Sequence, residues 1–173
     1  EKGATLKVIP VADNGELVME EYDKLLSNKT RVVAVNHVSN ALGTINPVNE
    51  ITRKAHAVGA KVLIDGAQST PHMKVDVQDI GCDFYTFSGH KMYAPSGIGG
   101  MFGKMEVMET MSPYVTGGDM IMQVTLEKTT YAKPPARFEA GTPPISQVIG
   151  LGAAIDYLNS IGMDNIFRYE KSL

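Results

Sequence analysis

The sequence predicts an α/β fold built mainly on a parallel sheet. Three runs rich in β-branched and aromatic residues, 31–35, 61–65 and 83–87, are typical of buried strands. Helical patterns lie between these runs, and strands that alternate with helices form βαβ units in a parallel sheet. The 173 residues, of which 43% are hydrophobic and 20% charged, suffice for a single domain with its own core.

The elements around the first buried strand follow from local patterns. Residues 6–11 predict a short strand before the turn at 13–15, and residues 19–26 predict a helix. The run 31–35 is apolar almost without a break, which indicates a strand buried on both faces.

The helix that follows this strand has clear end signals. We expect Asn46 to cap its N-terminus, Pro47 to occupy its first turn and Gly59 to end it. A weaker helix or turn is expected around residues 75–80, before the third strand.

The last part of the chain predicts one more strand, a loop and three helices. Residues 98–103 form the strand, and a helix begins at about Lys104, with Met residues at 105, 108 and 111 packed on the sheet. Residues 112–136 carry Gly-Gly and Pro-Pro pairs, which are typical of an irregular functional loop. An apolar stripe over 145–158 predicts a long helix that Gly162 ends, and a final helix starts at Met163.

Composition excludes several classes of function. The formal net charge is -3 and no basic run is present, which argues against a nucleic-acid partner. No apolar stretch in the sequence reaches the roughly 18 residues of a membrane-spanning helix. The single cysteine, Cys82, excludes an intrachain disulfide framework and a CxxC zinc site, and the 4 histidines lack metal-ligand spacing. We therefore expect no nucleic-acid, membrane or metal partner.

Polar residues follow the three buried strands at the point where each strand ends. Parallel sheets bind ligands beyond the carboxyl ends of their strands, so these residues are expected to meet at one edge. The candidates are His37 and Asn40 after the first strand, Asp65 and Gln68 at the second, and Ser88, His90 and Lys91 at the third.

The amine and the carboxylate in this set point to one cofactor. Taken alone, Asp65 is a carboxylate that caps the turn after its strand, and Lys91 is an ordinary solvated lysine. Together they suit pyridoxal phosphate (PLP), because the amine forms a Schiff base and the carboxylate keeps the ring nitrogen protonated. Ser88 and His90 are then placed to donate hydrogen bonds to the phosphate, and Gln68 to reach the phenolic oxygen.

Four segments of the chain also carry a family resemblance. They are Asn36–Thr44 (NHVSNALGT), Asp65–Gln68 (DGAQ), Ser88–Gly99 (SGHKMYAPSGIG) and Arg137–Pro143 (RFEAGTP). With these motifs in order, the sequence closely resembles the class V aminotransferase-like family of fold-type I PLP enzymes. Within that family it resembles the group II cysteine desulfurases of the SufS type, also called selenocysteine lyases. The resemblance implies a mainly parallel sheet with helices on both faces.

The resemblance implies a role for each candidate at the strand ends. Lys91 would be the lysine that binds the cofactor and then moves the substrate proton. Asp65 would pair with the pyridinium nitrogen and Gln68 with the ring oxygen, while Ser88 and His90 would hold the phosphate.

Three further residues gain roles from the resemblance alone. Asn40 would contact the ring oxygen or the substrate carboxylate, with support from His37, which we count with Lys91 as a catalytic candidate. Thr142 would reach the phosphate of the partner subunit's cofactor, because enzymes of this family are homodimers with shared sites.

The sequence departs from the family pattern in one respect. Such enzymes carry the substrate's sulfur on a cysteine in a later segment, whereas Cys82 lies at the start of a buried strand and reads as a small core residue. We therefore expect residues 1–173 to be the central part of a PLP-binding large domain, without its N-terminal part and its C-terminal small domain, and to be inactive in isolation.

The implied activity is removal of sulfur or selenium from L-cysteine or selenocysteine to give alanine and an enzyme persulfide. The implied setting is a cytoplasmic homodimer that passes sulfur to an acceptor protein for iron–sulfur cluster assembly. Kynureninase-like or epimerase-like chemistry would use the same cofactor contacts, and a non-catalytic fragment with the cofactor fold is a further alternative.

Two other motifs carry less weight. Ser88 and Lys91 match the S-x-x-K pattern of serine acyl-enzymes, but Gly89 and Pro95 disfavour the helix that this chemistry requires, and no SDN or KTG element follows. Residues 97–100 are glycine-rich but lack the GxGxxG spacing of a dinucleotide site.

Overall fold

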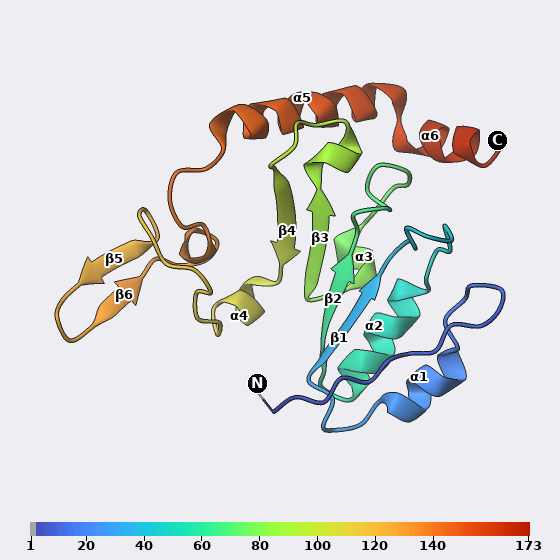
Figure 1. Cartoon of the computed structure of the whole chain (residues 1–173), viewed down its shortest axis with the longest axis horizontal. Coiled ribbons are helices and arrows are strands. Elements are labelled where there is room, and N and C mark those ends of the chain that lie inside the picture. The colour runs from blue at the N-terminus through green and yellow to red at the C-terminus, as the bar shows by residue number, and fades with distance from the viewer. Residues whose placement is uncertain (1–2) are drawn as a thin grey trace.

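A computed structural model describes residues 3–173 and contains a four-stranded sheet, a separate hairpin and helices around them (Figure 1). The strands of the sheet are β1 (Val32–Asn36), β2 (Lys61–Asp65), β3 (Phe84–Ser88) and β4 (Gly99–Gly103), and those of the hairpin are β5 (Ile121–Val124) and β6 (Thr129–Tyr131). The α-helices are α1 (Met19–Leu25), α2 (Val48–Ala57), α3 (Val77–Ile80), α4 (Met105–Met108), α5 (Ile145–Ile161) and α6 (Met163–Glu170), and the 3₁₀ turns are η1 (Gly89–Met92) and η2 (Ala136–Phe138).

The sheet confirms the predicted mainly parallel α/β class. Its order is β1-β2-β3-β4, with β1, β2 and β3 parallel and β4 antiparallel to β3. The predicted strands at 31–35, 61–65, 83–87 and 98–103 are present within one residue at each end.

The core lies between one face of the sheet and α1, α2 and α3. Val62 and Ile64 point from β2 into this layer and are fully buried, as is Ile51 of α2. The Tyr22 side chain of α1 is also buried there, and its hydroxyl donates to the carbonyl oxygen of Ile51 at 2.9 Å. This apolar layer fixes the strands whose ends carry the polar candidates.

The opposite face of the sheet is largely open within residues 3–173, which corrects the prediction that the first strand is buried on both faces. Val32 is 63% exposed, so β1 is not buried on both faces, and Met101 of β4 is 48% exposed. Helices α1–α3 share one face, α4 covers only the end near Gly103, and α5 runs across the end of β3 and β4 (Figure 1). The described residues therefore place α1–α3 on one face of the sheet and the short α4 on the other, with most of that second face uncovered.

Two predictions near the N-terminus were wrong. Residues 6–11 form no strand and are limited to an isolated bridge between Val11 and Leu17, because Pro10 lacks a donor and no strand of the described residues lies alongside. Asn46 does not cap α2 with its side chain. Its amide instead donates to the backbone and side-chain oxygens of Asn36 at 2.9 Å, which ties the start of α2 to the end of β1.

The segment after β4 also differs from its prediction. The helix after Lys104 is only four residues long. Of the three methionines predicted to pack on the sheet, only Met108 is buried, whereas Met105 is 47% and Met111 is 39% exposed. Residues 112–136 contain the β5–β6 hairpin rather than loop alone. The flanking glycines and prolines masked the β-branched residues that form the hairpin.

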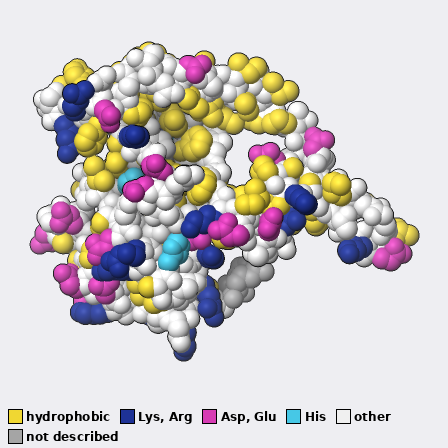
Figure 2. All heavy atoms as spheres, turned by 180° about the vertical axis from the view of Figure 1, so that it is seen from behind, with side chains coloured by type: hydrophobic (Ala, Val, Ile, Leu, Met, Phe, Trp, Pro, Cys, Tyr) yellow, Lys and Arg dark blue, Asp and Glu magenta, His cyan; other side chains and the backbone are white. Residues whose placement is uncertain are grey.

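The C-terminal helices agree with their predictions. Helix α5 covers the predicted stripe and ends at Gly162, whose φ is +87°. Only Ala154 and Leu158 of α5 are buried, and Figure 2 shows hydrophobic side chains gathered along this helix. None of the helices in residues 3–173 is both long and apolar enough to cross a membrane.

Candidate functional site

The polar segments predicted at the strand ends lie side by side at one edge of the sheet. In the register of the parallel strands, Asn36 is beside Asp65, and Asp65 is beside Thr86. The chain therefore leaves the three neighbouring strands on the same side, and the predicted meeting of these segments is confirmed.

Asp65 ends β2 and points to the open face of the sheet. Alternation along the strand buries Ile64 toward the helices and leaves the Asp65 side chain exposed. Its Oδ1 accepts a hydrogen bond from the backbone N–H of Ala67 at 2.9 Å, so the carboxylate does cap its turn. No other hydrogen bond and no ion pair within residues 3–173 involves this carboxylate, which leaves Oδ2 for a ligand.

Lys91 lies in η1, a single 3₁₀ turn that begins directly after β3. As expected from Gly89 and Pro95, the segment forms no α-helix and is limited to this one turn. Gly89 is needed because a Cβ would lie 2.6 Å from Cγ2 of Ile98, and Pro95 stands beyond the turn. Within residues 3–173 Lys91 forms no ion pair, and its side chain is half-buried.

Helix α5 supports the segment that carries Lys91. Tyr93 follows η1 with a φ of 63°, and its ring packs edge-on against Tyr157 of α5 at 6.1 Å between centroids. A Cβ on Gly150 of α5 would lie 2.6 Å from Cγ of Pro95, so the absence of a side chain allows this close approach. The lysine therefore sits on a short turn held between the sheet and a long helix.

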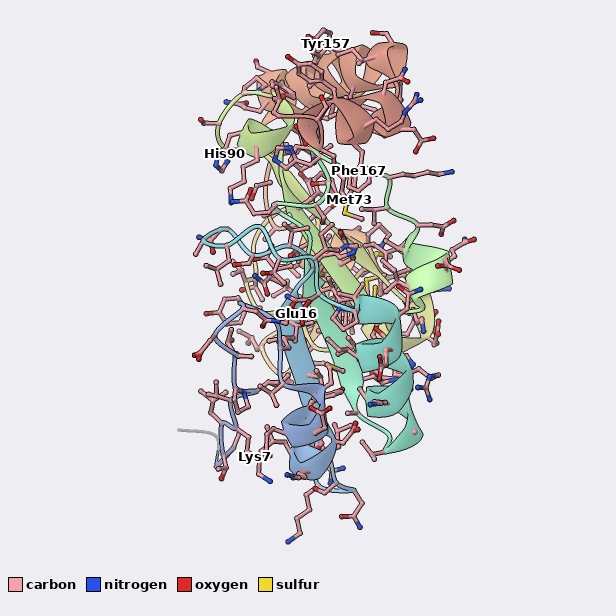
Figure 3. The ribbon with its side chains drawn as sticks, turned by 90° about the vertical axis from the view of Figure 1, so that its right-hand side faces the viewer. Lys7, Glu16, Met73, His90, Tyr157 and Phe167 are labelled. Carbon is pink, nitrogen blue, oxygen red and sulfur yellow. The ribbon has the colours of Figure 1, made fainter. Side chains whose placement is uncertain are left out.

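The other candidates at this edge remain accessible. Asn40 and His90 are exposed, and Gln68 and Ser88 are partly buried. Figure 3 shows His90 on η1 at the end of the sheet, near α5. Ser88 lies two residues beyond Thr86 and therefore shares the open face with Asp65, roughly 8 Å away between Cα atoms from the usual strand spacings.

Thr142 stands apart from this group. It is exposed in the connection between η2 and α5 rather than at a strand end. Its proposed contact with the cofactor of a partner subunit stays a prediction, as do the individual roles of the other candidates.

Sequence reasoning missed a buried hydrogen-bonded group beneath the site. His37 is 6% exposed, and its Nδ1 lies 2.9 Å from the hydroxyl of Tyr85, which is 2.5 Å from Oγ of Ser69. Burial lowers the pKa of His37 and raises the pKa of Tyr85 to about 12. No sequence pattern marks this group, because the close approach of Gly66 to Tyr85, where a Cβ would lie 2.0 Å from the ring, is visible only in the structure.

Cys82 is a core residue, as predicted. Its side chain is fully buried, and burial raises the pKa of its thiol. A buried thiol with a raised pKa is a poor nucleophile, because the thiolate is the reactive form.

The family follows from a comparison with known proteins. The family model for the class-V aminotransferases (Aminotransferase class-V) matches residues 1–173. The chain belongs to this family.

Curated relatives with high identity to this chain are named cysteine desulfurases. The chain is 56% identical to the one from Dickeya dadantii over 170 residues, which cover 98% of this chain and 41% of the relative. It is 53% identical to the one from Synechococcus elongatus over 173 residues, which cover 100% of this chain and 28% of the relative. The chain thus spans less than half the length of each of these proteins.

Solved structures of two cysteine desulfurases share the fold. The cysteine desulfurase CsdA from Escherichia coli matches with a TM-score of 0.87 and 36% identity, covering 91% of this chain and 39% of that one. The apo cysteine desulfurase from Thermococcus onnurineus NA1 matches with a TM-score of 0.89 and 41% identity, covering 95% of this chain and 41% of that one. This similarity confirms the α/β fold of the sheet and the elements around it.

Proposed function

We propose that the protein containing this chain is a PLP-dependent cysteine desulfurase and that its cofactor is held at the strand-end edge of the sheet. The observation that carries the proposal is the pair of Asp65 and Lys91 at the ends of adjacent parallel strands, neither of which forms an ion pair within residues 3–173. The relatives named cysteine desulfurase, up to 56% identical, support cysteine as the substrate.

The chemistry of the side chains at this edge fits PLP. The cofactor offers a cationic ring nitrogen, an acceptor oxygen on the ring, a phosphate and an aldehyde, and the edge offers a carboxylate, an amide, a hydroxyl, an imidazole and an amine. Bound PLP supplies an aldehyde that reacts with amino groups and a protonated ring that withdraws electrons from the α-carbon of the substrate.

Each side chain would then contact a specific part of the cofactor or substrate. The free Oδ2 of Asp65 would accept a hydrogen bond from the protonated ring nitrogen, and the turn bond to Ala67 fixes the direction of the carboxylate. Gln68 donates its amide to the ring oxygen, and Ser88 and His90 donate to the phosphate. Lys91 would hold the cofactor through Nζ, and the same amine, when free, would take up and return the α-proton of the substrate.

Three residues complete the site in this proposal. Asn40 orients the substrate carboxylate or the ring oxygen, and His37 supports it from its buried position behind the strand end. Thr142, which is exposed outside the strand-end group, reaches the phosphate bound by the partner subunit.

The remaining features belong to the whole protein and are part of the proposal. Residues 1–173 form the central part of a cofactor-binding large domain, and a cysteine outside this chain takes the sulfur, because Cys82 is buried. We expect a cytoplasmic homodimer with a sulfur-acceptor protein as its partner. Selenocysteine is a second substrate of the same chemical class.

The decisive assay supplies the full-length protein with PLP and L-cysteine and measures alanine. We expect alanine release and persulfide on the protein, with little alanine from L-kynurenine. Alanine from L-kynurenine but not from L-cysteine would assign kynureninase-like chemistry instead.

Lys29→Ala is a matched control for Lys91→Ala, because Lys29 is an exposed lysine and its hydrogen bond to Ser27 Oγ is made by the backbone N–H. The control should keep full alanine release and the visible absorption of bound PLP. A Lys91→Ala protein that keeps both would overturn the assignment of the cofactor site.

A further inference from the structure

A chain of three buried polar side chains connects the strand ends beneath the proposed site. Ser69 follows β2, Tyr85 lies on β3 and His37 follows β1, and these residues are 0%, 2% and 6% exposed. The Tyr85 hydroxyl lies 2.5 Å from Ser69 Oγ and 2.9 Å from His37 Nδ1. These hydrogen bonds therefore connect all three segments that carry the candidate residues.

The Tyr85 ring also packs directly against the turn that follows Asp65. A Cβ on Gly66 would lie 2.0 Å from Cε1 and 2.5 Å from the hydroxyl oxygen of Tyr85. Only glycine allows this approach, so the position of the turn and that of the tyrosine depend on each other.

We assign the direction of the Ser69–Tyr85 and Tyr85–His37 hydrogen bonds from the donors that already reach the neighbouring carbonyl oxygen of Gly66. The carbonyl oxygen of Gly66 already accepts from Ser69 N at 3.1 Å, Thr70 N at 3.0 Å and Thr70 Oγ1 at 3.0 Å. Ser69 Oγ also lies 3.0 Å from this oxygen, but a carbonyl oxygen has only two lone pairs, so we assign the Ser69 proton to the bond with the closer Tyr85 oxygen.

This assignment also sets the tautomer of His37. With its oxygen accepting from Ser69, the Tyr85 hydroxyl donates its hydrogen bond to Nδ1 of His37. An imidazole that accepts at Nδ1 carries its proton at Nε2 when neutral. Burial lowers the pKa of His37 and raises that of Tyr85 to about 12, so both groups are neutral near pH 7.

We propose that Tyr85 is a positioning residue of this site: its hydroxyl, oriented by Ser69, fixes His37 as a hydrogen-bond donor at Nε2. The proposal rests on the proposed function for its ligand, PLP. In this arrangement His37 supports the site by donating a hydrogen bond and takes no proton from the substrate, because its Nε2 is already protonated. The roles of Tyr85 and Ser69 extend the site below the candidates found from the sequence.

The first test compares Tyr85→Phe with Tyr22→Phe in the full-length apoprotein titrated with PLP. Tyr22 is a matched control because it is also 2% exposed and its hydroxyl makes one buried hydrogen bond, to Ile51 O at 2.9 Å, away from the strand ends. We expect roughly tenfold weaker PLP binding for Tyr85→Phe, the effect of one net buried hydrogen bond, and no change for Tyr22→Phe. Equal PLP affinity of Tyr85→Phe and wild type, or equal losses in both variants, would overturn the proposal.

The second test needs no destabilising change. Ring-nitrogen NMR shifts of ¹⁵N-histidine-labelled wild-type protein, with His37 assigned by its loss in His37→Gln, should show a protonated Nε2 and an unprotonated Nδ1. The opposite tautomer would overturn the proposal. Wild-type protein that binds PLP but releases no alanine from L-cysteine would contradict the proposed function alone, and both tests would still decide the role of Tyr85.

Discussion

Two aspartates at opposite ends of neighbouring strands differ in how fully the fold satisfies them. Asp83 precedes β3 and is buried, and its carboxylate accepts from His56 Nε2 at 2.7 Å, Val62 N at 2.8 Å and Lys61 Nζ at 3.3 Å. Asp65 ends β2, is exposed and accepts from one backbone N–H at 2.9 Å.

The difference separates a structural carboxylate from one kept for a ligand. Buried charges require complete hydrogen bonding, and Asp83 obtains it from the end of α2 and the start of β2. Asp65 faces the edge where Lys91 and the other accessible candidates lie, and its Oδ2 accepts no hydrogen bond from the described residues. The amino-terminal edge of the sheet is therefore closed by internal bonds, and the carboxyl-terminal edge is open for chemistry.

The largest expected effect lies at the open edge. Lys91→Ala removes the only amine expected to bond the cofactor and to move the substrate proton. We predict that kcat for alanine release by the full-length protein falls by roughly 10²–10⁴-fold, the range for loss of a positioned proton-transfer group. Steady-state kinetics and urea unfolding of the same sample should show lost activity at nearly unchanged stability. A large loss of stability would contradict the view that Lys91 serves a ligand rather than the fold.

Asp65→Asn keeps the size of the side chain and the turn oxygen but removes the charge. We predict a loss of about 10²–10³-fold in kcat, as for removal of one preorganised electrostatic group, with little change in the free energy of unfolding. Asp13→Asn, at an exposed turn, is the control and should change neither quantity. Activity within twofold of wild type for Asp65→Asn would contradict its role.

Asp83→Ala tests the closed edge, where we expect a loss of stability rather than a loss of activity. It leaves the N–H of Val62 and the side chains of His56 and Lys61 without their shared acceptor. We predict a loss of about 3 kcal/mol in the free energy of unfolding, because breaking a buried pair leaves uncompensated polar groups. Among molecules that remain folded, as measured by PLP absorbance, kcat should match wild type.

The same carboxylate predicts a pH dependence. Burial acts to raise the pKa of Asp83, but the hydrogen bonds from His56, Val62 N and Lys61 outweigh it and leave the pKa below its ordinary value. The unfolded chain therefore binds this proton more readily, so the contribution of Asp83 is complete above the ordinary pKa and is lost as the pH falls through the folded pKa. In urea titrations, the stability difference between wild type and Asp83→Ala should shrink below about pH 4; a constant difference would contradict this.

The smallest effect is expected at Thr52 of α2. Its Oγ1 is buried and has no hydrogen-bond partner among the described residues. Replacement by Val keeps the shape and removes the unpaired hydroxyl, so we predict an increase of up to about 1 kcal/mol in the free energy of unfolding. Urea unfolding of Thr52→Val beside Thr30→Val, whose hydroxyl accepts from Ser27 N at 3.0 Å, checks the sign.

The sheet and the edge that carries the candidates were predictable from the sequence. Each buried strand is a short β-branched or aromatic run, and parallel strands bring the residues after their ends together without any knowledge of side-chain contacts. The positions of Asp65 and Lys91 relative to the sheet followed from this rule alone.

The rest depends on contacts that sequence patterns do not encode. Asn46 was expected to cap a helix, but its amide reaches back to Asn36 over ten residues of chain. Tyr85 lies in a run that predicts a strand and nothing more, and only its contacts with Ser69 and His37 reveal its role in the site. Exposure of Val32 depends on which elements pack over β1, and no local pattern reports that.

The most direct test of the open edge is to locate the cofactor chemically. The full-length protein with PLP is reduced with borohydride, which fixes the cofactor on the amine that holds it, and is then digested and mapped by mass spectrometry. We predict a pyridoxyl group on the peptide that contains Lys91 and its absence from Lys91→Ala. A modification carried by a different lysine in the wild-type protein, with Lys91 unmodified, would contradict it.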